Sequence, residues 1–247
     1  MNLKAIFAAL AALAALSTQA LAGQTNVAVA ANFTEPVKEI AALFKQKTGH
    51  EAILSFGASG PLLAQITHDA PFQVFLSADE ERPKAAVELG LAVKSTLFTY
   101  AIGKLVLWSR VLDVTNGEAV LKGGAFSKLA IANPNAAPYG AAAIQTMKAL
   151  AVYDALQTKI VQGNSIAQTF AFVDTKNAEL GFIALSQLFG VTEGTRWLLP
   201  QHLYAPIRQD AVLLTKGEND EASKGFIEFL KGPRARAVIK KFGYALD

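Results

Sequence analysis

Cysteine is absent from this chain of 247 residues, so no disulfide bond can stabilise it and no thiol can carry a lipid anchor. Charged residues are also scarce, at 17%, whereas hydrophobic residues reach 52%, a composition typical of a globular protein. The formal net charge is only +3, and the basic residues are scattered singly or in pairs such as Lys45/Lys47. Because there is no basic stripe, the sequence does not indicate a nucleic-acid partner.

Catalytic and metal-binding motifs are missing as well. The three histidines, His50, His68 and His202, stand in polar contexts without a recognisable motif, and no P-loop or metal-ligand spacing occurs. A nucleophile elbow needs Gly-x-Ser-x-Gly, but in Gly57-Ala58-Ser59-Gly60-Pro61 the second glycine comes one position early. The sequence therefore predicts a protein that is not an enzyme and has no cofactor. An exported serine hydrolase that uses Ser59 is a less favoured alternative.

The N-terminal residues have the pattern of a secretory signal peptide. Lys4 precedes an apolar run from Ala5 to Leu16, and Ala20-Leu21-Ala22 supplies the small residues of a cleavage site. The run is too short for a stable membrane anchor, and no later hydrophobic segment has the length of a membrane span. We therefore predict a signal peptide at residues 1–22, cleavage after Ala22 and a mature protein in the periplasm.

Short apolar runs that favour strands alternate with amphipathic segments of helical period. Strands are predicted at residues 27–30, 52–56, 74–76, 103–108, 129–132, 159–161, 180–183 and 210–215. Helices are predicted at residues 34–47, 61–68, 80–89, 140–151, 165–173, 220–230 and 233–242. This order favours an α/β fold of two units, each a mostly parallel sheet flanked by helices, with a ligand cleft between them.

Four junctions between a strand and a helix share small residues and candidate helix caps. They are Ala30–Pro36, Gly57–Pro61, Pro138–Ala141 and Asn164–Gln168. Asn32 or Thr34 can cap the first helix, and Ser165 with Gln168 forms a capping box. A helix N-terminus leaves backbone N–H groups free at its positive end, which can bind an anion without a charged side chain. Any single junction is better explained as an ordinary cap, as is the acidic run at residues 79–81, and the sequence does not show that the four converge.

Eight segments of the chain stand out in combination. They are VAVAANFTEPVKEIAALFKQKTGH, SFGASGPLLAQI, DAPFQVFLSADEERP, FTYAIGKLVLWS, IANPNAAPYG, NSIAQ, LGFIALSQ and KGPRARAVIKKFGY. Together they resemble the periplasmic molybdate-binding proteins of ABC transporters over essentially the whole mature chain. The resemblance implies a type II periplasmic binding protein with two domains in the Venus-flytrap arrangement. We expect the first domain at residues 23–99 and 205–247 and the second at residues 100–204.

The resemblance also implies which residues bind the ligand. Asn32 matches a loop that supplies backbone and side-chain donors, and Ser59 matches a serine that supplies its hydroxyl and its N–H. Tyr139 and Ile166 match positions that each supply a backbone N–H. Ala31 adds a further backbone contact at most.

The implied ligand is the tetrahedral molybdate or tungstate dianion, which a monomeric protein would deliver to a membrane permease, with no metal ion coordinated directly by the protein. Neutral donors can stabilise a dianion without a partner charge that must itself be desolvated. Some members have threonine at Ala31 and tyrosine at Ala184, where this chain offers only backbone groups. The alternative is a protein of the same fold that binds another oxyanion or a small organic acid.

Overall fold

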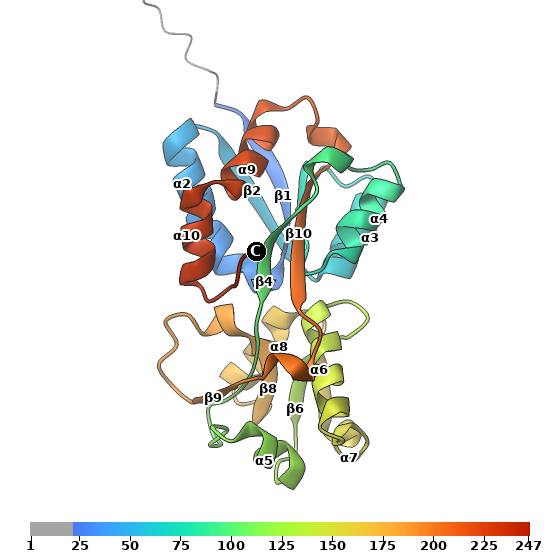
Figure 1. The fold of residues 1–247 in the computed structure, drawn as a ribbon, viewed down its shortest axis with the longest axis vertical. Helices are drawn as coiled ribbons and strands as arrows, with labels where there is room; N and C mark the ends of the chain where they lie inside the picture. The colour runs from blue at the N-terminus through green and yellow to red at the C-terminus, as the bar shows by residue number, and fades with distance from the viewer. Residues whose placement is uncertain (1–21) are drawn as a thin grey trace, which may run out of the picture.

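The computed structural model describes residues 22–247, and the predicted signal peptide lies outside them except for Ala22. Two lobes, each built on a five-stranded sheet, are stacked along the long axis of the molecule (Figure 1). The prediction of an α/β fold with two sheets flanked by helices is confirmed. Within residues 22–247, no helix is long and apolar enough to cross a membrane.

The first lobe, which is the upper one in Figure 1, contains the sheet with strand order β2-β1-β3-β10-β4. Its strands are β1 (Gln24–Ala30), β2 (Glu51–Gly57), β3 (Val74–Leu76), β4 (Phe98–Gly103) and β10 (Ile207–Leu213). β1 pairs in parallel with β2 and β3, whereas β10 runs antiparallel between β3 and β4. Its helices are α2 (Thr34–Thr48), α3 (Ser59–Thr67), α4 (Glu81–Glu88), α9 (Glu221–Lys231) and α10 (Pro233–Lys241), with short 3-10 turns η1 (Ala31–Phe33), η2 (Lys94–Thr96) and η6 (Thr215–Gly217).

The second lobe repeats this plan with the strand order β7-β6-β8-β5-β9. Its strands are β5 (Leu105–Ser109), β6 (Leu129–Ala132), β7 (Ile160–Gly163), β8 (Leu180–Ala184) and β9 (Thr195–Leu198). β6 pairs in parallel with β7 and β8, and β5 lies antiparallel between β8 and β9. Its helices are α5 (Gly117–Gly123), α6 (Pro138–Ala149), α7 (Tyr153–Leu156) and α8 (Ile166–Asp174), with the turns η3 (Gln157–Lys159), η4 (Leu185–Leu188) and η5 (Gln201–Leu203).

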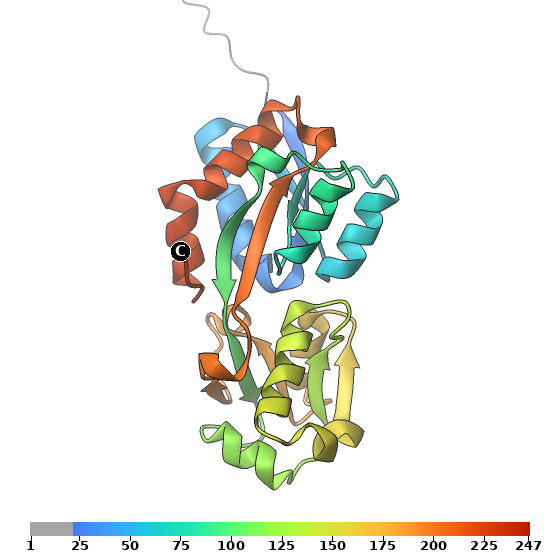
Figure 2. The same ribbon diagram turned by 45° about the vertical axis from the view of Figure 1, so that its right-hand side comes forward.

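Alternating side chains on the strands of the first lobe serve two separate cores. Val27 and Val29 pack in the core beneath α2, α9 and α10, whereas Ala28 packs in the core beneath α3 and α4, and the two groups of helices lie on opposite faces of the sheet (Figure 2). In the first core the ring of Phe44 meets Phe226 edge-on at 5.3 Å. Burial of one such side chain stabilises the fold by about 1.5–3 kcal/mol. The apolar face predicted for α2 is therefore the face that holds it on the sheet.

Several predicted boundaries are wrong. The segment predicted as one strand at residues 103–108 contains the end of β4 and most of β5, which lie in different sheets and meet at Lys104. The sequence prediction missed all of β4 except Gly103, and it missed β9, α5 and α7, which are short and lack a clear period. Each sheet is mixed, because β10 in the first sheet and β5 in the second run antiparallel to their neighbours. The expected domain boundary between Thr99 and Tyr100 falls inside β4.

Two short segments connect the lobes, and both can be followed in Figure 2. Lys104 joins β4 to β5, and the chain returns from η5 to β10 through residues 204–206. Gly103 lies at the first connection, where a β-carbon would collide with the hydroxyl of Tyr139 and with Gln209. Only glycine therefore allows Tyr139 of the second lobe to approach the first sheet this closely.

Candidate anion-binding site

Two pairs of parallel strands end at the boundary between the lobes. β1 and β2 end in register at Ala30 and Gly57, and β6 and β7 end in register at Ala132 and Gly163. The next helices in the chain, which are α2 with its preceding turn η1, α3, α6 and α8, all begin at these ends. The carboxyl ends of parallel strands are where such folds place their ligands.

One small cavity, of about 10 Å³, is lined by residues from all four helix N-termini. The lining residues are Ala30, Ala31, Asn32, Gly57, Ala58, Ser59, Ala78, Ala137, Pro138, Tyr139 and Ile166. The structure thus brings together all the site residues named from the sequence, including Ala31. None of the lining side chains carries a charge, and most are small, so a compact ligand can reach the backbone.

Four backbone N–H groups at this cavity make no hydrogen bond in the loops and turns of residues 22–247. No acceptor outside the helix and strand ladders of residues 22–247 pairs with these N–H groups, which belong to residues that line the cavity. These residues are Asn32, Ser59, Tyr139 and Ile166. Each helix N-terminus carries about half a positive charge, so four of them together match the charge of a dianion.

The hydroxyl of Ser59 is oriented by the first lobe. Ser59 is 1% exposed, and its Oγ accepts a hydrogen bond of 2.9 Å from the N–H of Ala78. Because the oxygen acts as acceptor in this bond, its own proton remains to be donated, and no acceptor for it is found among residues 22–247. Ser59 therefore offers two donors to a ligand, its hydroxyl and its backbone N–H.

Asn32 does not cap α2, and neither does Thr34, in contrast to the prediction. The 3-10 turn η1 continues directly into α2, and the hydroxyl of Thr34 donates back to the carbonyl of Ala31 at 2.9 Å. The side-chain nitrogen of Asn32 donates to Gln209 Oε1 at 2.8 Å and to the hydroxyl of Tyr244 at 2.9 Å. Both of its hydrogen atoms are engaged, so the backbone N–H is the donor that Asn32 has left.

The N-terminus of α6 holds Tyr139 against the end of β6. Pro138 occupies the first turn, where its missing N–H costs nothing. Gly140 follows because a β-carbon there would collide with the carbonyl of Ala132. The Tyr139 hydroxyl accepts a hydrogen bond of 3.1 Å from Gln209 Nε2 of the first lobe. Burial raises the pKa of the Tyr139 phenol well above its ordinary value, so this group stays neutral.

The N-terminus of α8 contains one half of the predicted capping box, because the side chain of Gln168 accepts from the residue before Ser165 and not from Ser165 itself. Ser165 Oγ accepts a hydrogen bond of 3.3 Å from the N–H of Gln168. Gln168 Oε1 accepts one of 2.6 Å from the N–H of Asn164. These bonds satisfy the neighbouring donors and leave the N–H of Ile166 for a ligand. Ala184, by contrast, does not line the cavity, and its N–H donates to Gln187 Oε1 at 3.0 Å.

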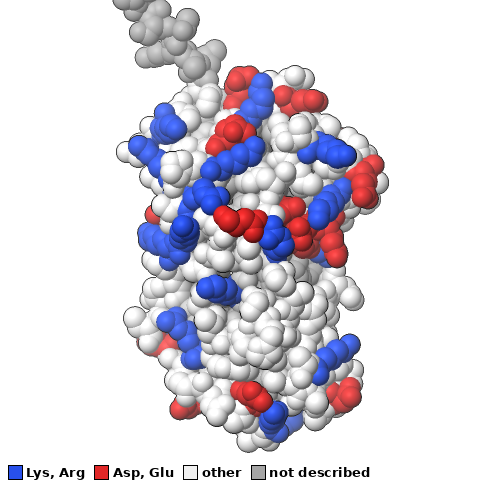
Figure 3. All heavy atoms as spheres, in the orientation of Figure 1, with Lys and Arg blue, Asp and Glu red and all other residues white. Residues whose placement is uncertain are grey.

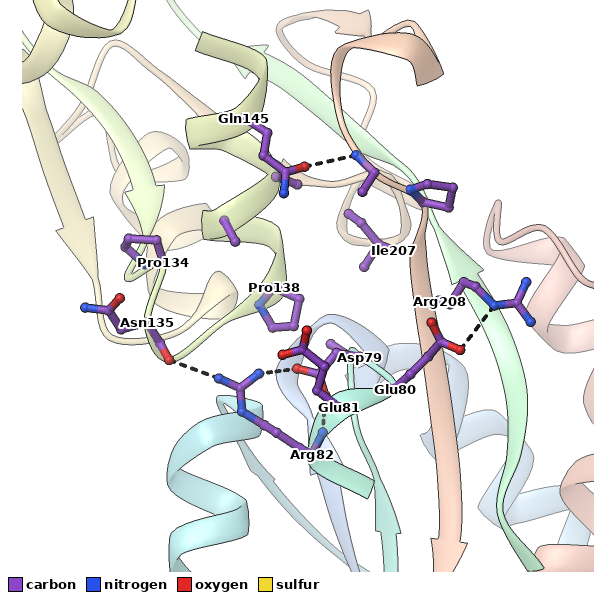
Figure 4. A pocket seen from close by; sticks show the side chains of 15 residues that line it. Asp79, Glu80, Glu81, Arg82, Pro134, Asn135, Pro138, Gln145, Ile207 and Arg208 are labelled. Atoms are coloured by element: carbon purple, nitrogen blue, oxygen red, sulfur yellow. Dashed lines mark hydrogen bonds and ion pairs between the residues drawn. The ribbon is translucent and has the colours of Figure 1, made fainter. Parts of the chain in front are cut away.

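Charged side chains gather outside the cavity, in a larger pocket of about 450 Å³ that both lobes line (Figure 4). Arg82 pairs with Asp79, and its Nη2 donates across the lobes to the carbonyl of Asn135 at 2.9 Å. The N–H of Gly60 makes a second such bond, of 3.0 Å, to the carbonyl of Ala136. Asp79 Oδ1 also accepts from the N–H of Arg82 at 3.1 Å, so the acidic run caps α4 as predicted. These contacts close the edge of the cleft over the cavity.

The rest of the molecule offers no competing chemistry among the described residues. His50 and His68 bond to backbone groups of their own surroundings, and no histidine lines the cavity beside Ser59. Within residues 22–247, no group of three or more histidine or acidic side chains could hold a metal ion. Several basic side chains lie together on the left of the upper lobe (Figure 3), but no basic side chain lines the cavity. A serine hydrolase therefore has no general base next to its nucleophile.

Two lobes that close over an uncharged cavity of backbone donors define a binding protein for a small anion. The family of bacterial extracellular solute-binding proteins matches residues 25–245. The chain is 52% identical over 247 residues to the molybdate-binding protein ModA of Rhodobacter capsulatus, and the match covers 100% of this chain and 98% of that protein. It is 50% identical to ModA of Azotobacter vinelandii, over 94% of each chain. This protein belongs to the bacterial extracellular solute-binding proteins and, among them, to the ModA family.

Solved structures agree with this assignment. The periplasmic molybdate-binding protein of Azotobacter vinelandii superposes with a TM-score of 0.86 and 40% identity, over 90% of this chain and 99% of that one. The sulfate-binding protein SubI of Mycobacterium tuberculosis superposes with a TM-score of 0.70 over 90% of this chain and 86% of that one, but at 13% identity it shares the fold alone. The ModA relatives are binding proteins of a transport family, which confirms the prediction that the chain is not an enzyme.

Sequence reasoning did not name some residues that shape the site. Ala78 follows β3 and orients Ser59, and its position after a third parallel strand could have indicated it. Gln209 and Tyr244 bond to the side chain of Asn32 from distant parts of the chain, 177 and 212 residues away. No local pattern signals such contacts.

Proposed function

We propose that this protein binds molybdate, and also tungstate, in the cavity between its lobes and delivers the ion to the permease of an ABC transporter. The observation that carries the proposal is the convergence of four helix N-termini, with free N–H groups and the Ser59 hydroxyl, on one uncharged cavity. The ModA relatives support molybdate as the particular ion.

Neutral donors suit a fully deprotonated oxyanion. A cavity lined by N–H and O–H donors has no acceptor for the proton of a phosphate, so protonated ions are disfavoured. The cavity is tighter than an ion with four oxygen atoms, so we expect the helix N-termini that line it to shift slightly outward around the ligand. Size then separates molybdate and tungstate from the smaller sulfate ion, which would be coordinated incompletely.

Titration calorimetry on protein stripped of ligand tests this proposal. We expect one molybdate per chain, competition by tungstate, and little competition by sulfate or phosphate. With molybdate at a thousand times its dissociation constant, mass action should stabilise the protein by about 4 kcal/mol, which a melting curve detects. The absence of both heat and a melting shift would refute the proposal. Tight binding of sulfate instead would favour the alternative of another oxyanion.

We further propose that the mature protein begins at Gly23 in the periplasm and acts as a monomer of two domains. The first domain would comprise residues 23–103 and 205–247, since all of β4 belongs to the first sheet. N-terminal sequencing of the exported protein checks the cleavage after Ala22, and its mass in solution checks the monomer.

A further inference from the structure

A buried polar network lies beside the cavity and connects the two lobes. Its members are Asn32, Gln209 and Tyr244 from the first lobe and Tyr139 and Ser186 from the second. All five are at most 5% exposed. Only Asn32 and Tyr139 line the cavity itself.

Tyr244 is the centre of this network. It follows α10, and its ring packs edge-on against Phe33 at 5.4 Å. Its oxygen accepts from Asn32 Nδ2 at 2.9 Å, and it lies 2.8 Å from the carbonyl of Asn32 and 2.9 Å from Ser186 Oγ, both of which can accept its proton. Ser186 Oγ donates to the same Asn32 carbonyl at 2.9 Å. Two hydroxyls, one from each lobe, thus hold a residue whose N–H faces the cavity.

The surroundings of Ser186 show that this is a contact between lobes. Ser186 lies in η4, which follows β8 of the second sheet. On the same segment Phe189 meets Phe242 at 4.3 Å between ring centroids, and Leu185 packs against Gly243. The end of the first lobe after α10 is therefore a docking surface for η4. If the lobes rotate apart, the bonds from Ser186 to Tyr244 and Asn32 must lengthen.

We propose that Tyr244 is a positioning residue, which acts together with Ser186 to fix Asn32 toward the anion and to hold the lobes closed, so that it slows release of the ligand. This inference rests on the proposed function and deepens it. Tyr244 does not touch the ligand, since it does not line the cavity. Its effect is transmitted through Asn32 and through the bond to Ser186.

Release of radioactive molybdate into excess unlabelled molybdate measures this effect. We expect Tyr244→Phe and Ser186→Ala each to release the label roughly tenfold faster, equivalent to about 1.4 kcal/mol, with little change in the association rate. Because both changes break one network, the double variant should be little faster than either single variant. Ser186→Ala tests the same contact from the second lobe in case Tyr244→Phe does not fold.

Ser223→Ala is the matched control. Its hydroxyl is also buried, but it bonds to Thr25 and Asp220 within the first lobe, away from the cavity and from the connections between the lobes. It should lower the melting temperature and leave the release rate unchanged. Release from Tyr244→Phe and Ser186→Ala at the wild-type rate, or equal acceleration in Ser223→Ala, would overturn the inference. Failure of the wild-type protein to retain any label would instead refute molybdate binding itself.

Discussion

The hydroxyl of Ser59 provides the sharpest test of the binding site. The change Ser59→Ala removes one atom from a side chain that is 1% exposed and leaves the helix N-terminus and its free N–H in place. The lost oxygen would otherwise make two bonds in the protein with its ligand bound. It accepts from the N–H of Ala78, and we expect it to donate to the anion.

The two lost bonds affect different quantities. A hydrogen bond to a charged group contributes about 1.5–3 kcal/mol, so molybdate affinity should fall roughly 10- to 150-fold. The N–H of Ala78 loses its acceptor, which should lower the free energy of unfolding by about 1 kcal/mol. For a chain of this length, that corresponds to a fall of about 2–4 °C in melting temperature.

Calorimetry with molybdate and a melting curve of the ligand-free protein separate these effects. Ser223→Ala is the matched control, because Ser223 is also fully buried in the first lobe and its Oγ bonds to Thr25 and Asp220, away from the cavity. The control should lose stability and keep the wild-type affinity. If Ser59→Ala keeps the wild-type affinity, then Ser59 serves only to hold Ala78, and its assigned role as a ligand donor is wrong.

Two further predictions concern the frame of the site. Gly140→Ala should lower the free energy of unfolding by about 1–3 kcal/mol, because the new β-carbon meets the carbonyl of Ala132. Gly123→Ala is the control, because its new β-carbon enters open space and should leave the stability unchanged. Urea titration measures both values, and equal stability of the two variants would contradict the packing at α6. Burial raises the pKa of the phenols of Tyr139 and Tyr244. Since the folded-state pKa values exceed that of an unfolded tyrosine, their contribution to stability is complete below about pH 10 and is lost as the pH rises further. Alkaline melting curves should fall less steeply for Tyr244→Phe than for the wild-type protein, and identical curves would count against a buried phenol at this position.

Local chemistry explains which parts of the site were predictable. The alternation of apolar strands and amphipathic helices, the small residues after β2 and the cap by Ser165 are patterns of adjacent residues, and the structure contains all three. The register that brings Ala30 beside Gly57, and Ala132 beside Gly163, follows from parallel pairing. The sequence therefore indicated each helix N-terminus separately.

Tertiary contacts explain which parts were not predictable. That the four N-termini meet depends on how the lobes pack, which no single segment encodes. The strand β10 is inserted antiparallel between β3 and β4 from more than a hundred residues away, and it carries Gln209 to the side chain of Asn32. The resemblance to molybdate-binding proteins implied that the Asn32 side chain serves the ligand, but distant partners engage both of its amide hydrogens. The short elements α5 and β9 have too few residues to display a period.

The most direct test is a crystal structure of the protein with molybdate, located by the anomalous scattering of molybdenum. We predict one anion in the cavity, with its oxygen atoms about 2.7–3.2 Å from the hydroxyl of Ser59 and from four backbone nitrogens. Those nitrogens belong to Asn32, Ser59, Tyr139 and Ile166. An anion bound instead beside Arg82 in the outer pocket, or coordinated by fewer than two of the four helix N-termini, would contradict the assignment of this cavity as the binding site.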